Sequence, residues 1–335
     1  MTDSLKEQLN DAGFQTQQLG KDVLVSEFGG RVLALMPDGQ SNLLWINPEV
    51  FSNFNHIKKC GEWPNLGGER LWISPEVDSN IGNPKDFWGS YRVPSEMDPA
   101  HYSLILQPRR TSGCWSTEME IPWLRSKAKI QLKIGRSIQV ETKAPFPIDT
   151  SVHYAGYSLS STLQIIEAPA DARPCLWHIV QIPNGGVVDT KVFPGANPKS
   201  FIGTPQWKRL NKECISTPTE TEESFKWSLT ASEARCIMLY TRKLENGDSS
   251  LLVRTFPVTT NSDYSDCPAY DLEQTGHMCQ VFVGDDQIGS FSEMEFHAPS
   301  LSQTNPGPTN TRCQAHGFIG SENAIQHIYN KFFKQ

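Results

Sequence analysis

The chain has 335 residues, of which 38% are hydrophobic and 20% are charged, and its formal net charge is −7. This share of apolar residues supports a hydrophobic core and excludes a mainly disordered chain. The acidic balance, without any block of Lys and Arg, excludes a protein built to bind nucleic acid, because phosphate binding needs a concentrated basic surface.

The ends of the chain and its cysteines indicate the cellular setting. The first ten residues lack the apolar centre of a secretory signal, and no later segment is apolar for long enough to span a bilayer. We therefore expect a cytoplasmic protein with no membrane partner, and we take a monomer as the default while the oligomeric state stays open. The eight cysteines form no Cys-x-x-Cys pair, which predicts free thiols and no zinc site.

Hydrophobic periodicity predicts strands along nearly the whole chain, and 24 Gly and 23 Pro supply turns between them. Asp38-Gly39 predicts a hairpin turn, Ile134-Gly135 predicts a second turn, and residues 217–224 and 300–312 are expected to form loops. The expected strands cover residues 22–27, 31–36, 42–46, 102–107, 116–121, 128–134, 137–143, 157–167, 176–182, 225–229, 237–242, 251–256 and 278–283.

Helix signals are confined to the two ends of the chain. Residues 4–12 have a helical pattern, and Ser321 is placed to cap a helix in which Ala324, Ile325, Ile328 and Phe332 share one face. No repeat or linker divides the sequence. We therefore predict an all-β protein with one domain over residues 1–335, built from two or more packed antiparallel sheets, with residues 1–20 as an N-terminal extension and 321–335 as a C-terminal helix.

Two further strand-like segments, residues 65–76 and 292–299, carry the side chains best suited to binding a ligand and transferring protons. Alternate residues of a strand share a face, so Arg70 and Trp72 lie together, as do Glu293, Glu295 and His297. An indole beside a guanidinium, and two carboxylates beside an imidazole, are suited to holding and protonating a sugar.

Each of these groups also has a simpler structural interpretation. Two neighbouring carboxylates resist ionising together, which raises one pKa if their face is sheltered, but Glu293 and Glu295 on an exposed face would simply be solvated. The alternative for the other strand is Trp72 in the core, with Arg70 paired to Glu69 or Glu76. The fork of Arg70 suits hydroxyls, a carboxylate or a phosphate, so the sequence leaves open whether the sugar is neutral, acidic or phosphorylated.

Several runs resemble the galactose mutarotase-like (aldose 1-epimerase-like) proteins. The runs are Gly29-Gly-Arg-Val-Leu-Ala-Leu, Asn42-Leu-Leu-Trp-Ile-Asn-Pro48, Gly67-Gly-Glu-Arg-Leu-Trp-Ile-Ser-Pro-Glu76, Arg173-Pro-Cys-Leu-Trp-His-Ile-Val-Gln-Ile-Pro183 and the Glu-x-Glu segment that ends at Pro299. The resemblance implies a β-supersandwich with a sugar cleft on one sheet, and it points to an uncharacterised, divergent branch. Asn65-Leu66-Gly67-Gly68 stands where the family has a His-Gly pair.

The resemblance also implies an assignment of roles, without a metal or a nucleotide cofactor. Glu295, or else Glu293, corresponds to the base that acts on the anomeric hydroxyl, and His178 corresponds to the acid that acts on the ring oxygen. Alternation places His178 with apolar residues, which is also typical of a core histidine, so His153 and His297 are reserve candidates. The expected substrate contacts are Arg70, Trp72, Glu76, Trp177, Gln181 and His297.

We therefore expect a carbohydrate-active protein that interconverts anomers or epimers of a sugar or sugar derivative. The missing His-Gly pair favours an alternative, a non-catalytic protein that binds a carbohydrate. A third possibility is a hydrolase or lyase acting on a glycan, with Glu76 as the second carboxyl group across the scissile bond.

Overall fold

A computed structural model describes residues 2–52, 63–287 and 289–334 of the chain. Its strands form two antiparallel sheets, of nine and ten strands in the described residues, as expected for an all-β protein. The nine-stranded sheet runs in the order β1 (Thr16–Leu19), β2 (Val23–Ser26), β3 (Arg31–Leu35), β4 (Glu69–Ser74), β9 (Cys175–Pro183), β18 (Phe291–His297), β17 (His277–Val283), β14 (Phe225–Thr230) and β11 (Lys199–Ile202).

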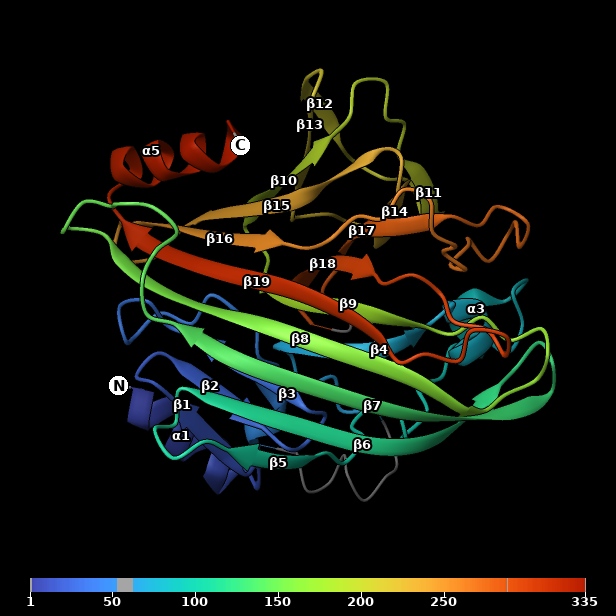
Figure 1. The fold of residues 1–335 in the computed structure, drawn as a ribbon. Coiled ribbons are helices and arrows are strands. Elements are labelled where there is room, and N and C mark those ends of the chain that lie inside the picture. Colours follow the sequence, from blue (N-terminus) through green and yellow to red (C-terminus); the bar gives the residue numbers. More distant parts are fainter. Residues whose placement is uncertain (1, 53–62, 288, 335) are drawn as a thin grey trace.

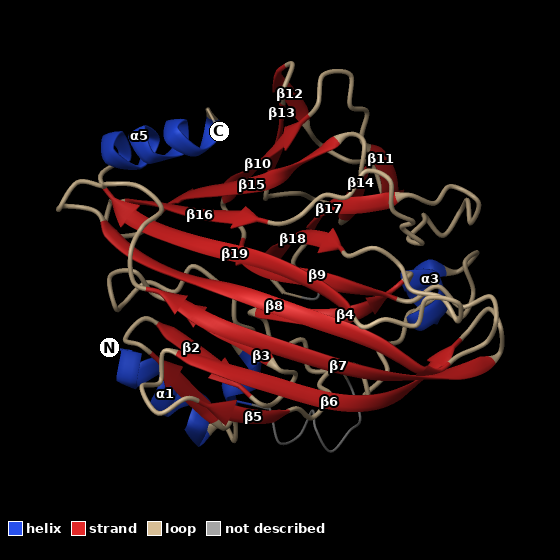
Figure 2. Cartoon of the chain, in the orientation of Figure 1, coloured by secondary structure: helices blue, strands red, loops and turns tan. Residues whose placement is uncertain are grey.

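The ten-stranded sheet contains the longest strands. These strands cross the middle of the molecule, with β3, β4 and β9 behind them (Figures 1 and 2). The order is β12 (Lys208–Asn211), β13 (Cys214–Pro218), β10 (Gly186–Val192), β15 (Ala234–Lys243), β16 (Ser249–Thr255), β19 (Thr309–Gly320), β8 (His153–Glu167), β7 (Ala128–Glu141), β6 (Ser112–Trp123) and β5 (Ser103–Leu106). The helices are α1 (Thr2–Asp11), α3 (Glu76–Ser79), α4 (Phe87–Ser90) and α5 (Glu322–Phe333).

The central strands of the nine-stranded sheet are buried along both faces. All residues of β4 and β18, and all of β9 except its last, are buried, although β4 and β18 carry several polar and charged side chains. One face packs on the ten-stranded sheet, where Phe296 of β18 stacks on Phe256, the residue after β16, at 4.8 Å between ring centroids. The opposite face carries the pocket described below.

A charged cluster is enclosed between the two sheets. Glu69 of β4 accepts hydrogen bonds from Tyr157 on β8 and from Arg254 on β16, and its other oxygen lies 3.8 Å from Arg136 on β7. All four side chains are buried. Because buried charges are stable only when paired, this cluster fixes how the two sheets are placed against each other.

Helix α5 covers the outer face of the ten-stranded sheet. Its hydroxyl cap is the predicted one, with Ser321 accepting from the amide of Ala324 at 3.4 Å, and Ile325, Ile328 and Phe332 are buried as expected. They pack against Val253 of β16 and other apolar residues of that face. The N-terminal helix predicted over residues 4–12 is also present, as α1.

The hairpin predicted around Asp38-Gly39 is wrong in its second strand. Residues 42–46 form no strand and make a single bridge, between Ile46 and Gly67. The reason is the side chain of Asn42, which accepts from the amide of Leu35 and donates to the carbonyl of Leu33. An amide side chain thus takes the place of a neighbouring strand, a known form of competition with secondary structure.

The turn predicted at Ile134-Gly135 is also wrong. Residues 128–141 form one strand, β7, in which Gly135 pairs with Thr162 of β8 and Ser116 of β6. A Cβ atom at this position would lie 2.7 Å from Oγ1 of Thr162, so this glycine provides space instead of a turn. The loops predicted at residues 217–224 and 300–312 are shorter than expected, because residues 217–218 belong to β13 and residues 309–312 belong to β19.

None of the helices in the described part of the chain is long and apolar enough to cross a membrane. Seven cysteines lie in that part, and all seven are free thiols, as predicted.

Replacing Glu69 by Gln tests the role of the cluster between the sheets. The change leaves Arg254 and Arg136 buried without a carboxylate partner, and we expect it to lower the free energy of unfolding by about 3–5 kcal/mol, measured by urea denaturation. Glu118→Gln is the matched control, because Glu118 pairs with Lys133 at 3.1 Å on the exposed surface, where an ion pair contributes little. Equal effects of the two substitutions would contradict the assignment.

Candidate active site

Side chains from three adjacent strands meet on the outer face of the nine-stranded sheet. The register pairs Trp72 of β4 with Trp177 of β9, and Trp177 with His297 of β18. Two residues further along β9, Ile179 pairs with Arg70 on one side and with Glu295 on the other. Paired residues of antiparallel strands share a face. The structure therefore brings together Arg70, Trp72, Trp177, Gln181, Glu293, Glu295 and His297 on one face, as the alternation predicts.

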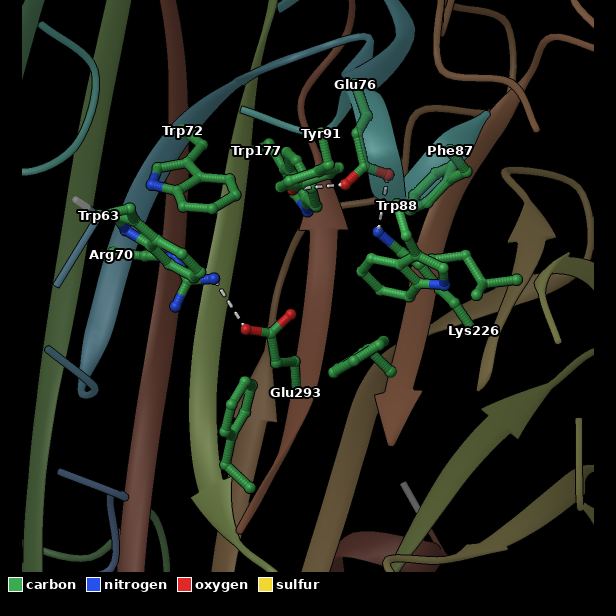
Figure 3. Close-up of a pocket in the computed structure, with 13 residues that line it drawn as sticks. Trp63, Arg70, Trp72, Glu76, Phe87, Trp88, Tyr91, Trp177, Lys226 and Glu293 are labelled. Atoms are coloured by element: carbon green, nitrogen blue, oxygen red, sulfur yellow. Dashed lines mark hydrogen bonds and ion pairs between the residues drawn. The ribbon is translucent and has the colours of Figure 1, made fainter. Parts of the chain in front are cut away.

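A pocket of about 200 Å³ opens over this face (Figure 3). This volume is below the roughly 300–1,000 Å³ that is typical of sites for drug-sized ligands, so the pocket suits a small ligand. Segments outside the sheet supply Glu76 of α3, Phe87 and Trp88 of α4, Trp63 and Tyr91. The described residues that line it are Trp63, Arg70, Trp72, Glu76, Phe87, Trp88, Tyr91, Trp177, Ile202, Lys226, Phe282, Phe291 and Glu293.

Glu293 is the carboxylate of β18 that faces this pocket. Its Oε1 accepts hydrogen bonds from Arg70 at 2.8 Å and from Gln181 at 2.9 Å. No described residue donates to its Oε2, which is not among the buried unpartnered atoms. Both donors bind the same oxygen, and the second oxygen is left available to a ligand.

Glu295 lies on the same face but is fully buried and does not line the pocket. Its Oε2 accepts from the indole of Trp177 at 2.6 Å and lies 3.1 Å from Nζ of Lys226. Burial raises the pKa of Glu295 to about 8, because desolvation outweighs the attraction of Lys226, and Glu293 and Glu76 add repulsion.

Glu76 reaches the pocket from the first turn of α3. It accepts from the hydroxyl of Tyr91 at 2.8 Å, and its other oxygen lies 3.5 Å from Nζ of Lys226. Burial raises the pKa of Glu76, and the charge of Lys226 opposes that rise only in part. Burial opposes the charge of Lys226 as well, but Glu295 and Glu76 outweigh it and raise the pKa of this ammonium.

Two tryptophans of the pocket, Trp63 and Trp72, are fixed by one carboxylate. Asp98 accepts from the indole of Trp63 at 2.9 Å and from that of Trp72 at 3.0 Å, and it forms an ion pair with Arg31. The guanidinium of Arg70 lies over Trp72, 4.2 Å from the ring centroid. The aromatic wall is therefore held rigidly by hydrogen bonds and a cation–π contact.

The structure does not bring His178 to the pocket. Its side chain lies on the opposite face of β9, where it stacks on Phe296 at 4.4 Å, and neither ring nitrogen has a hydrogen-bond partner in the described residues. The alternation of β9 causes this, because it places Trp177 and Gln181 on the pocket face. Burial lowers the pKa of His178 well below its usual value, and Arg136 and Arg254 lower it further.

The two reserve histidines also lie outside the pocket lining. His297 stacks on Trp177 at 5.5 Å beneath the pocket, with its Nε2 3.7 Å from Asp266. Burial lowers its pKa to about 4, so it is neutral near pH 7. His153 is exposed at the start of β8. None of the described lining residues is a histidine.

Sequence reasoning missed several residues that line the pocket or hold its walls. Lys226 lies in a predicted strand, between Phe225 and Trp227, and a lysine inside such an apolar strand is a usable signal for a buried ion pair. Trp63, Tyr91 and Asp98 lie in segments without a periodic pattern, and no local signal identifies them.

One further group of buried side chains has ligand types that metals use. Glu69, His178 and Cys313 offer atoms within 4.8 Å of one another in the cluster between the sheets. Arg254 and Arg136 already surround Glu69 with positive charge, which disfavours a metal cation at this position.

Comparison with models of known protein families gives no match, and comparison with curated proteins gives none either. Among known structures, galactose 1-epimerase from Lactobacillus acidophilus NCFM is similar with a TM-score of 0.45 and 10% sequence identity, over 91% of this chain and 94% of that chain. This likeness is distant.

The position of His178 predicts an effect on stability against pH. The folded protein resists protonating this imidazole, whereas the unfolded chain takes up a proton below about pH 6.5, so the histidine lowers stability as the pH falls through this range. We expect His178→Leu to reduce the fall in unfolding free energy between about pH 7 and 5, by up to about 1.4 kcal/mol per pH unit.

Urea denaturation at a series of pH values measures this slope. His153→Gln is the control and should not change it, because solvent surrounds this exposed side chain in the folded and unfolded chain alike. An unaltered slope in His178→Leu would contradict the buried, neutral state of this residue.

Proposed function

We propose that this protein binds a sugar in the aromatic pocket and interconverts its anomers by general acid–base catalysis, with Glu293 as the base and Glu76 as the acid. The observation that carries the proposal is that two carboxyl groups with different electrostatic partners line one small aromatic pocket, on different sides of it in Figure 3. Two carboxyl groups placed in different environments are a common basis for such a division of roles.

The aromatic lining supports a sugar as the ligand. Indole faces pack well on the apolar C–H side of a pyranose, and Trp63 and Trp88 both line the pocket. Carboxylates then accept from hydroxyl groups around the edge of the ring. The size of the pocket favours one ring over a glycan, so we give less weight to a hydrolase or lyase.

The sequence left open whether Glu293 or Glu295 is the base. Glu293 is supported because it lines the pocket and Glu295 does not. Oε2 of Glu293 is available to a ligand, and Arg70 and Gln181 hold its other oxygen in place. Glu295 is instead a positioning residue, because it holds the indole of Trp177 and the ammonium of Lys226 from behind the pocket.

Glu76 is suited to the role of acid because burial raises its pKa and because Tyr91 orients it. In the proposed reaction Glu293 removes the proton of the anomeric hydroxyl while Glu76 gives a proton to the ring oxygen. The bond between the anomeric carbon and the ring oxygen breaks, the anomeric oxygen becomes an aldehyde, and rotation before closure gives the other anomer. The reverse proton transfers restore both carboxyl groups.

A second candidate is a protein that binds the sugar without turning it over. The absence of a histidine from the described lining residues favours it, since the family resemblance implies a histidine acid. Such a protein would show sugar-dependent tryptophan fluorescence that Trp72→Ala weakens, and no change in the rate of anomer equilibration.

Proton NMR of anomeric signals in freshly dissolved single anomers tests the proposal. We expect the protein to accelerate equilibration, and Glu293→Gln and Glu76→Gln each to lower the rate by about 100- to 10,000-fold, the usual contribution of one proton-transfer group. The exposed control Glu118→Gln should keep the full rate. Full activity in both Glu293→Gln and Glu295→Gln would exclude a base on β18.

A further inference from the structure

The pocket has a charge pattern that defines the class of sugar it takes. We infer that it accepts a pyranose bearing a protonated amino group in preference to a neutral one, and that it excludes uronic acids and sugar phosphates. The inference rests on the proposed function in one respect only, that the ligand is a sugar. It follows from how each charged group of the pocket is already paired.

Negative groups outnumber positive ones at this site. Glu76 and Glu293 line the pocket and Glu295 lies directly behind it, whereas Arg70 and Lys226 are the cations among the described lining residues. When Glu76 carries the proton of the proposed reaction, Glu295 still balances Lys226, and Glu293 balances Arg70, so each cation keeps one carboxylate beside it. No positive charge is therefore left over for an anionic ligand.

Arg70 is not available to a carboxylate or phosphate, although its residue type suggested this role. Its Nη2 is bound to Glu293, and its face is stacked on Trp72. Its Nε and Nη1 have no partner in the described residues but are buried away from solvent. The guanidinium therefore orients Glu293 and the tryptophan wall, and it presents no free fork to the pocket.

Lys226 is occupied in the same way. Its ammonium lies 3.1 Å from Glu295 and 3.5 Å from Glu76, and 4.3 Å from the centroid of the Trp177 ring. An anion at this ammonium would lie beside Glu76 and Glu295, and their carboxylates would repel it.

The free groups of the pocket suit an ammonium. Oε2 of Glu293 has no donor in the described residues, so it offers a charged acceptor. Around it stand aromatic side chains, among them Trp88, which is 52% exposed. Aromatic faces attract an ammonium through their quadrupole, and a carboxylate beside them adds a charge-assisted hydrogen bond.

A panel of sugars with one ring and different charges tests the inference. Calorimetry would compare glucosamine, glucose, glucuronic acid and glucose 6-phosphate at a pH where the amine is protonated. We expect glucosamine to bind about tenfold more tightly than glucose, and both anions to bind at least about tenfold more weakly. Tighter binding of either anion than of glucose would overturn the inference and leave the proposed function intact.

Two charge-removing variants sharpen the test. Glu293→Gln should abolish the preference for glucosamine, because it removes the acceptor. Glu295→Gln should reduce the preference without touching the ligand, because it removes negative charge behind the pocket. Glu118→Gln, far from the pocket face on β6, should keep the preference of the unaltered protein. A preference that survives in Glu293→Gln would also overturn the inference.

A second readout separates failure of the inference from failure of the proposed function. If none of the sugars binds, the proposed function fails, and the charge of the pocket is then measured with small ions. Caesium and iodide quench tryptophan fluorescence, and the difference between the protein and Trp88→Phe isolates the signal of Trp88. Each ion is compared with its quenching of free tryptophan amide: stronger relative quenching of Trp88 by caesium supports the negative pocket, and equal or stronger relative quenching by iodide overturns it.

Discussion

Strands β4, β9 and β18 are buried on both faces, so each charged side chain on them needs a partner from another part of the chain. On the inner face Glu69 meets Arg254 of the other sheet. On the outer face Arg70 meets Glu293, and Glu295 meets Lys226. The need to pair buried charges thus joins the two sheets at the inner face of the nine-stranded sheet and assembles the pocket at its outer face.

The pairing on the outer face makes the pocket rigid before any ligand arrives. Asp98 fixes two indoles, Arg70 is stacked on one of them, and Glu295 holds the indole of Trp177. Groups held in this way need little reorganisation during a reaction, which is how preorganised sites stabilise developing charge. The buried pairs also decide which oxygens are left for a ligand, and Oε2 of Glu293 is the clearest case.

The sequence predicted the fold class because alternation is a strong local signal, and it predicted which residues of β4 and β18 share a face for the same reason. The sequence-based prediction failed at residues 42–46, where the side chain of Asn42 takes the place of a strand. It also failed at Gly135, which lies inside β7 and makes room for Thr162. In both cases a tertiary contact overrode a turn or strand pattern that is correct on average.

For the candidate site, the sequence by itself determined the faces: Arg70 and Trp72 lie on one side of β4, and Trp177 and Gln181 on the side of β9 opposite His178. Covalent geometry fixes this alternation without help from the rest of the chain. Only the tertiary structure decided the partners. Trp72 meets Asp98 from 26 residues away and Glu76 meets Lys226 from 150 residues away, and no local pattern encodes such contacts, because they arise when the two sheets and their loops pack.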